Sequence, residues 1–161
     1  MTMILPNLIC LEDYGGSWDE YLSALHACFT KDFIDSTPSF QGKRLGLKKH
    51  PIIQGKEATF WHFISEGDIE AERTPNLRRC ERLSWIRPII EGHPHESIKL
   101  WIEFRGSEER IHLCYGEWEY LVVLVDRGDY IIPWTAFHIE HNHSKRKFER
   151  KYKAYQAKIA S

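Results

Sequence analysis

The sequence lacks the features that mark several specialised classes of protein. No apolar run approaches the roughly 20 residues that a membrane-spanning helix needs. The first ten residues have no basic start and too short an apolar stretch for a secretory signal. Internal repeats, low-complexity stretches and linkers are also absent from the sequence. We therefore expect one soluble, cytoplasmic domain over residues 1–161, with no membrane contact.

Closely paired cysteines are absent as well. The four cysteines are widely spaced: Cys10, Cys28, Cys80 and Cys114. None of them forms the Cys-x-x-Cys pair that is typical of zinc sites and redox motifs. Because the sequence also lacks a secretory signal, we expect four free thiols rather than disulfides.

Charge is balanced over the whole chain but unevenly distributed along it. The net charge is −1, yet residues 1–30 hold four acidic residues and no Lys or Arg. Residues 144–161 hold seven Lys and Arg against one Glu, and residues 73–90 hold five Arg against one Glu. A third basic group is Lys43, Arg44, Lys48 and Lys49. Local basic surfaces on a neutral protein suit a polyanionic partner, although solvated helix faces explain such runs equally well.

The first half of the chain predicts two helices and a short strand. Ser17 and Glu20 fit a capping box, and the apolar residues that follow predict a helix over 17–32. Residues 38–58 read as irregular or loosely extended chain. The aromatic and β-branched segment 59–65 predicts a strand. A second helix is expected to begin at Thr74-Pro75 and to end or kink at Pro88.

From residue 97 the apolar pattern changes to a period of two. It predicts four strands near residues 98–104, 111–115, 118–125 and 130–139, joined by tight turns. Pro133 favours an edge position or a bulge in the last strand. A basic helix over residues 144–158 follows. We therefore expect an α+β fold, in which helices pack on one face of an antiparallel meander of about four to five strands.

Histidine is abundant, with nine residues in the chain. The group at 138–143 and the pair His93 and His95 resemble metal ligands, but they lie in turns and at element ends, where nothing directs them to one point. We therefore expect no metal or other cofactor. His62 lies among large apolar residues, where it is either a hydrogen-bonded core histidine or a general acid/base.

Metal-free RNA cleavage needs few groups, and the chain holds candidates for each. One group removes the 2′-hydroxyl proton, another protonates the 5′-oxygen, and cations hold the phosphate. His62 suits proton transfer and the arginines suit phosphate binding. The remaining candidates for binding the phosphate, the bases and the hydroxyl groups are Lys49, Arg79, Arg82, Arg105, Arg110, Tyr115, Trp118, Trp134 and Thr135.

Two segments carry a resemblance to a known group of proteins. They are Ala58–Ile64, followed by the arginines at 73, 79 and 82, and Gly128–Ile139, followed by the Lys-rich helix. Over residues 45–158 the chain resembles the small ribonucleases of the barnase/EndoU/colicin/RelE superfamily, which are common in toxin–antitoxin systems and prophages. The resemblance leaves out the acidic N-terminal helical region, residues 1–35.

This resemblance implies helices packed on an antiparallel sheet of about four strands. It also implies that His62 and Thr135 line a catalytic site and that Arg79, Arg82 and Arg110 bind phosphate. The expected function is a metal-independent endoribonuclease of toxin or prophage type, with RNA as substrate and an inhibitory antitoxin protein as partner. Two alternatives remain: a non-catalytic nucleic-acid- or protein-binding module, and a metal-dependent hydrolase that uses the 138–143 histidines.

Overall fold

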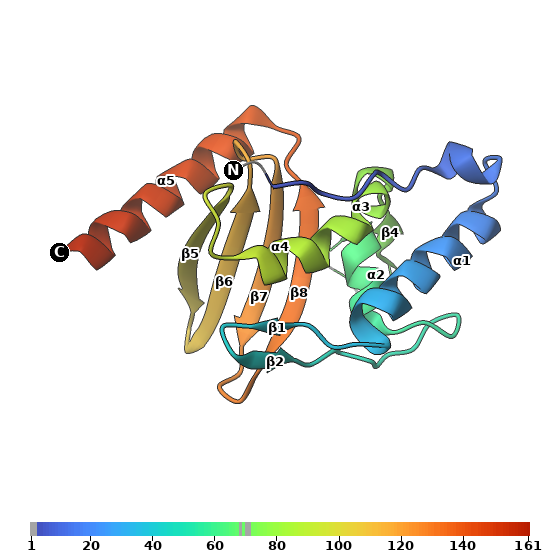
Figure 1. Ribbon diagram of the computed structural model, residues 1–161, viewed down its shortest axis with the longest axis horizontal. Helices are drawn as coiled ribbons and strands as arrows, with labels where there is room; N and C mark the ends of the chain where they lie inside the picture. Colours follow the sequence, from blue (N-terminus) through green and yellow to red (C-terminus); the bar gives the residue numbers. More distant parts are fainter. Residues whose placement is uncertain (1–2, 68, 70–71) are drawn as a thin grey trace.

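The computed structural model describes residues 3–67, 69 and 72–161. Its centre is a six-stranded sheet in the order β1–β2–β8–β7–β6–β5 (Figure 1). The strands of this sheet are β1 (Ser39–Phe40), β2 (Lys43–Leu45), β5 (Ile98–Arg105), β6 (Glu108–Tyr115), β7 (Tyr120–Asp126) and β8 (Tyr130–His138). The helices are α1 (Trp18–Phe29), α2 (Ala58–Ile64), α3 (Leu77–Glu81), α4 (Ile86–Gly92) and α5 (Asn142–Ala160). This arrangement confirms the α+β class, with six strands instead of four to five.

The four-stranded meander predicted from the alternating pattern is confirmed. Strands β5 to β8 pair antiparallel with their neighbours in sequence. The register between β7 and β8 shifts at Val123, so that Trp134 is an extra residue between Pro133 and Thr135. Pro133 therefore lies at a β-bulge, one of the two positions expected for it.

The N-terminal helix is also confirmed. The Ser17 hydroxyl accepts a hydrogen bond from the Glu20 amide at 3.3 Å, which caps α1 as the capping box predicts. A π-helical turn over Thr30–Ile34 extends the helix.

Residues 38–58 are more ordered than the sequence analysis predicted. They contain the β1–β2 hairpin, whose turn places Gln41 and Gly42 at positive φ. Strand β2 then pairs parallel with the start of β8, Leu45 lying opposite Ile131. The sheet is therefore mixed, and this pairing depends on a long-range contact that local patterning does not reveal.

Residues 58–64 form helix α2, so the predicted strand is wrong. Nearly every residue of the segment is apolar, and such a run fits a strand and a buried helix equally well. The structure buries all of them except Trp61. The Thr59 hydroxyl bonds to both the amide and the carbonyl of Lys48, which fixes the start of the helix.

The helix predicted from Thr74 is also displaced and divided. Thr74–Pro75 forms strand β4, which pairs with β3 (Ser65–Glu66) in a separate two-stranded ladder. Asn76 is the cap of α3, since its side chain accepts the Arg79 amide hydrogen at 3.1 Å. A 3₁₀ turn then leads into α4, and Pro88 lies in the first turn of α4, where proline is tolerated.

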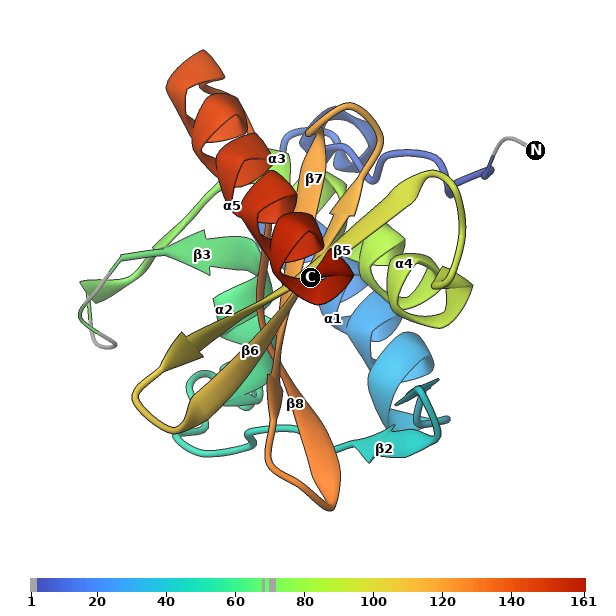
Figure 2. The ribbon, with the colours of Figure 1, turned by 90° about the vertical axis from the view of Figure 1, so that its left-hand side faces the viewer.

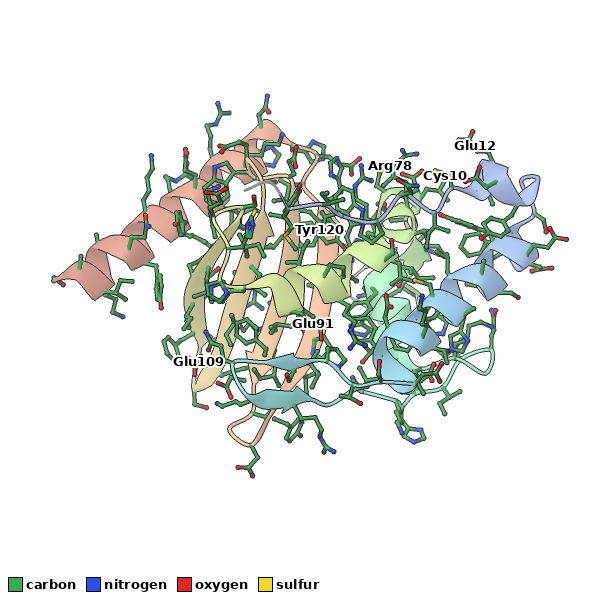
Figure 3. All side chains as sticks on the ribbon, viewed as in Figure 1. Cys10, Glu12, Arg78, Glu91, Glu109 and Tyr120 are labelled. Carbon is green, nitrogen blue, oxygen red and sulfur yellow. The ribbon has the colours of Figure 1, made fainter. Side chains whose placement is uncertain are left out.

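The helices cover both faces of the sheet, so the expectation of one covered face is wrong. The inner face packs against α1, α2, α3 and α4, with Tyr120 fully buried beneath them (Figure 3). The outer face packs against α5 through a smaller cluster around Trp101 and Phe148. Figure 2 shows α5 and α4 on opposite sides of the strands. Within the described residues, no helix is long and apolar enough to cross a membrane.

Candidate functional site

An open pocket of about 430 Å³ lies along the edge of β8. We call it the β8 pocket. Its lining comes from the loop before α2, from α2 itself, from the β3–β4 region, from α3 and from β8. The residues that line it are Lys48, His62, Glu66, Gly67, Arg73, Arg79, Trp134, Thr135 and Phe137. Three of these side chains are cationic and one is acidic, which makes the pocket attractive to an anion.

Two arginines of the pocket are held by the end of α2. Arg73 Nη2 donates to the Ser65 carbonyl at 2.5 Å, and Arg79 Nη1 donates to the same oxygen at 2.7 Å. Both guanidinium groups also reach the His62 carbonyl, at 3.4 and 3.5 Å. The carbonyl end of a helix carries partial negative charge, so it favours cations at this position. The two like charges are thereby held close together beside one cavity.

Arg79 is the more enclosed of the two arginines. Its Nη1 lies 3.3 Å from the Thr135 hydroxyl, and its guanidinium lies 5.3 Å from the centre of the Phe137 ring. Burial, and then the nearby charge of Arg73, lower the pKa of Arg79. An arginine remains protonated near neutral pH despite such a shift. An anion bound beside Arg79 would therefore relieve an unfavourable electrostatic environment.

His62 belongs to α2 and is 9% exposed. Its ring meets the Trp134 ring edge to face, with 5.8 Å between the centres. The Arg110 guanidinium also lies 5.5 Å from the centre of the Trp134 ring, and Arg110 Nε donates to a Glu108 carboxylate oxygen at 2.7 Å. Trp134 is the extra residue of the β-bulge, which is how β8 presents both Trp134 and Thr135 to the pocket.

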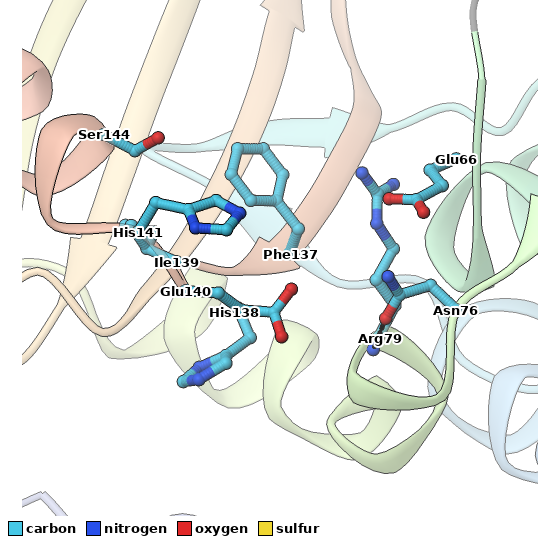
Figure 4. Close-up of a pocket in the computed structure, with 9 residues that line it drawn as sticks. All are labelled: Glu66, Asn76, Arg79, Phe137, His138, Ile139, Glu140, His141 and Ser144. Carbon is cyan, nitrogen blue, oxygen red and sulfur yellow. Dashed lines mark hydrogen bonds between the residues drawn. The ribbon is translucent and has the colours of Figure 1, made fainter.

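A smaller hollow of about 230 Å³ lies beside the β8 pocket, and Figure 4 shows the residues that line it. The two share Glu66, Arg79 and Phe137, and the hollow extends to His141 and Ser144 at the start of α5. Both cavities therefore lie beside the C-terminal half of β8.

The structure brings together four of the predicted site residues: His62, Arg79, Trp134 and Thr135. A fifth, Arg110, adjoins the pocket through its contact with Trp134. The structure adds Lys48, Arg73 and Glu66, which the sequence analysis did not assign to the site. Lys48 and Arg73 belonged to the basic groups already noted, but charge alone did not separate them from solvated neighbours.

Five predicted site residues lie elsewhere. Trp118 is buried in the outer aromatic cluster beside Trp101. Arg82 packs over Trp85 and contacts Glu81 at 3.5 Å. Lys49 lines a different depression, near Phe33, and Arg105 is exposed at the end of β5. Tyr115 packs against the inner core beside Trp85. We therefore remove these five from the candidate site: Lys49, Arg82, Arg105, Tyr115 and Trp118.

The histidines at 138–143 do not form a metal-binding group. Across the described residues, no three His, Cys, Asp or Glu side chains are placed to hold one ion. His141 and His143 stack on each other, with ring centres 5.4 Å apart. His138 lies in the hollow beside the pocket, where burial lowers its pKa.

The four cysteines are free thiols. Burial raises the pKa of Cys28, Cys80 and Cys114 to about 12, which leaves these thiols protonated and unreactive near neutral pH.

Comparisons with protein families, with curated proteins and with solved structures found no match for this chain.

Proposed function

We propose that the protein is a metal-independent endoribonuclease whose active site is the β8 pocket. One observation carries the proposal: a histidine, a hydroxyl and three cations from separate segments of the chain line one open cavity. These are the groups that phosphodiester cleavage needs in the absence of a metal ion. The resemblance of residues 45–158 to the barnase/EndoU/colicin/RelE ribonucleases supports the same assignment.

Substrate binding falls to the cations and to Trp134. Arg73 and Arg79 hold the phosphate, because paired guanidinium groups match phosphate oxygens and the two are already fixed side by side. Lys48 adds a further positive charge at the mouth of the pocket. Trp134, whose ring contacts both Arg110 and His62, offers a stacking surface for an unpaired base.

Cleavage uses the 2′-hydroxyl of the RNA as the nucleophile. His62 and Glu66 are the two side chains of the pocket that we assign to proton transfer. One takes the 2′-hydroxyl proton as that oxygen attacks phosphorus, and the other protonates the departing 5′-oxygen. The products are a 2′,3′-cyclic phosphate and a free 5′-hydroxyl. Arg79 and the Thr135 hydroxyl stabilise the charge that develops on the phosphate oxygens.

The test is cleavage of bulk tRNA and mRNA by the purified protein in EDTA. We expect cleavage by the wild type and a loss of about 10²–10⁴-fold in His62→Ala, the usual contribution of a general acid/base. Arg79→Lys keeps the positive charge but loses the paired N–H groups of the guanidinium, so we expect it to bind the phosphate more weakly and to cleave RNA more slowly. His50→Ala is the matched control, because His50 is exposed and outside the pocket. Wild-type rates in His62→Ala, with an intact circular dichroism spectrum, would remove His62 from the mechanism.

A second candidate function is RNA binding without cleavage. The observation that favours it is the low exposure of His62, which leaves little of the ring open to substrate. If the protein only binds RNA, the wild type should retain RNA without cleaving it in any buffer, and Arg79→Lys should bind RNA more weakly.

The toxin and prophage setting also belongs to the proposal. A ribonuclease of this kind acts on cytoplasmic RNA and needs an inhibitory protein in the cell that makes it. If expression of the protein stops the growth of the host, a neighbouring gene whose co-expression restores growth would encode that inhibitor.

A further inference from the structure

A second concave surface lies at the β5 edge of the sheet, between β5 and the C-terminal half of α5. We call it the α5 groove. It has a volume of about 570 Å³, and six of its nine lining residues are apolar. The lining residues are Trp101, Ile102, Glu103, Phe104, Lys151, Ala154, Tyr155, Lys158 and Ile159. None of them lines the β8 pocket.

The apolar side chains of the α5 groove are unusually accessible. Phe104 is 63% exposed and Ile159 is 64% exposed. They face a common cavity rather than being scattered singly over the surface. A shared exposed apolar surface of this kind is typical of a binding site, whereas single exposed apolar residues are normal.

Helix α5 extends past the sheet instead of ending on it (Figures 1 and 2). Its first half packs on the outer face through Phe148 and Tyr152. Beyond Tyr152, only Tyr155 is partly buried, and the other residues to the C-terminus are exposed. The C-terminal part of α5 therefore has a face that no other described part of the molecule covers.

The rim of the groove is positively charged. Residues 151–161 contain three lysines and no acidic residue. The one carboxylate in the groove, Glu103, is already bonded to Lys151 at 2.8 Å and to His112 at 3.0 Å. Lys158 makes no ion pair with any described residue, and Lys153 reaches Glu149 only at 3.9 Å. A ligand that carries acidic side chains would match this rim.

We propose that the α5 groove binds an acidic, amphipathic helix of a partner protein. The apolar floor receives the apolar stripe of that helix, and the lysines of the rim receive its acidic flanks. Ala154, the smallest side chain of the lining, allows a second helix to approach α5 closely. The apolar floor favours a protein over RNA, because a nucleic-acid strand is contacted mainly through its phosphates. The proposal does not depend on the proposed ribonuclease activity.

The test uses designed peptides as probes. The first is an 18-residue helical peptide with Leu and Phe at positions i, i+3, i+4 and i+7 and Glu on its flanks. The second has Lys in place of every Glu. Fluorescence anisotropy of the labelled peptides should show saturable binding of the acidic peptide and at least roughly tenfold weaker binding of the basic one. Phe104→Ser and Ile159→Ser should each weaken binding of the acidic peptide about tenfold, as expected for the loss of an apolar anchor.

Ile52→Ser is the matched control, since Ile52 is 53% exposed and lies outside the groove. Unchanged binding in that variant supports the proposal. Failure of the acidic peptide to bind at roughly 1 mM, or equal binding by Phe104→Ser, overturns it. If the acidic peptide does not bind, we would test a 20-nucleotide RNA, phosphatidylserine vesicles and a second copy of the chain. Binding of one of these that is lost in Phe104→Ser would assign the groove to that ligand and overturn the proposal. None of these results bears on RNA cleavage at the β8 pocket.

Discussion

The helices on the two faces of the sheet are attached by different kinds of contact. The inner face packs against α1 to α4 through a continuous apolar cluster that includes five fully or nearly fully buried phenylalanines, namely Phe29, Phe33, Phe40, Phe60 and Phe63. The outer face holds one helix, α5, which has no buried residue of its own. That helix is attached by a small aromatic cluster and by the carboxylate of Glu103. We therefore expect the free energy for opening the outer layer to be lower than that for opening the inner layer.

The outer attachment is a polar network centred on Glu103. Its carboxylate accepts hydrogen bonds from Trp101 Nε1 at 3.0 Å and from Lys151 Nζ at 2.8 Å, and it contacts His112 Nε2 at 3.0 Å. The Trp101 ring stacks on His112, with 4.9 Å between the ring centres. One side chain therefore joins β5, β6 and α5. Charged hydrogen bonds of this kind contribute more than neutral ones, but they depend on every partner being in place.

The largest expected effect comes from the inner layer. Phe63 is fully buried, and its ring centre lies 5.4 Å from that of Phe33 and 6.0 Å from that of Phe29. Phe63→Ala should lower the free energy of unfolding by about 3–5 kcal/mol, measured by urea titration. Phe148→Ala, in the outer cluster where the ring is only partly buried, should lower it by less, about 0.5–2 kcal/mol. Similar losses in both variants would contradict the difference between the layers.

A smaller and more local effect is expected at Glu103. Glu103→Gln keeps an acceptor for Trp101 but removes the charge that Lys151 and His112 contact. The free energy for opening α5, measured by amide hydrogen exchange over residues 148–155, should fall by about 1.5–3 kcal/mol. Exchange in α1 should change much less, because α1 belongs to the inner layer.

Cys114 provides a second readout for the Glu103 variant. Cys114 is buried in the outer cluster and Cys80 in the inner one, and burial raises the pKa of both thiols to about 12. Alkylation of Cys114 should therefore accelerate in Glu103→Gln, while alkylation of Cys80 should not. Glu109→Gln on β6 is the matched control, because Glu109 makes no ion pair with the described residues. Equal acceleration at both cysteines would show that the layers open together.

The same contrast explains which elements could be predicted from the sequence. Strands β5, β6 and β8 alternate between two faces, so a period of two is visible in their residues. The capping box of α1 is likewise a local signal. Helix α2 was missed because it is buried nearly all round, which removes the periodicity that separates a helix from a strand.

The candidate site was harder to predict than the fold, because its parts come from distant segments. Thr135 and Arg79 are 56 residues apart, and they meet only because α3 packs beside β8. Glu66 gave no local signal, since the β3–β4 ladder that holds it has two residues per strand, and Arg73 was noted only as one arginine of a basic segment. Arg79 and Arg82, by contrast, lie three residues apart but have different surroundings, because α3 ends between them. The residue types in the sequence indicated the chemistry. Tertiary packing decided which of the many arginines, histidines and hydroxyl residues lie together in the pocket.

The smallest expected effect is a pH dependence confined to the outer layer. Burial lowers the pKa of His112, and the nearby positive charges of Lys151 and Arg110 lower it further, although Glu103 opposes this. A histidine whose folded-state pKa lies below its unfolded value, about 6.5, contributes stability above that pH and loses it as the pH falls. Burial raises the pKa of Glu103, but the hydrogen bonds from Lys151 and Trp101 outweigh it and leave that pKa lowered. Glu103 therefore loses its contribution only in more acidic solution, below about pH 4.3.

Between pH 7.5 and 5.0, then, only His112 acts on this network. The free energy for opening α5, from hydrogen exchange over residues 148–155, should fall by about 0.5–1 kcal/mol across that range. His112→Gln should be less stable at pH 7.5 but should show no such slope, since glutamine does not titrate. The inner helix α1 serves as the internal reference within each sample. An equal slope in the variant would assign the pH response to a group other than His112.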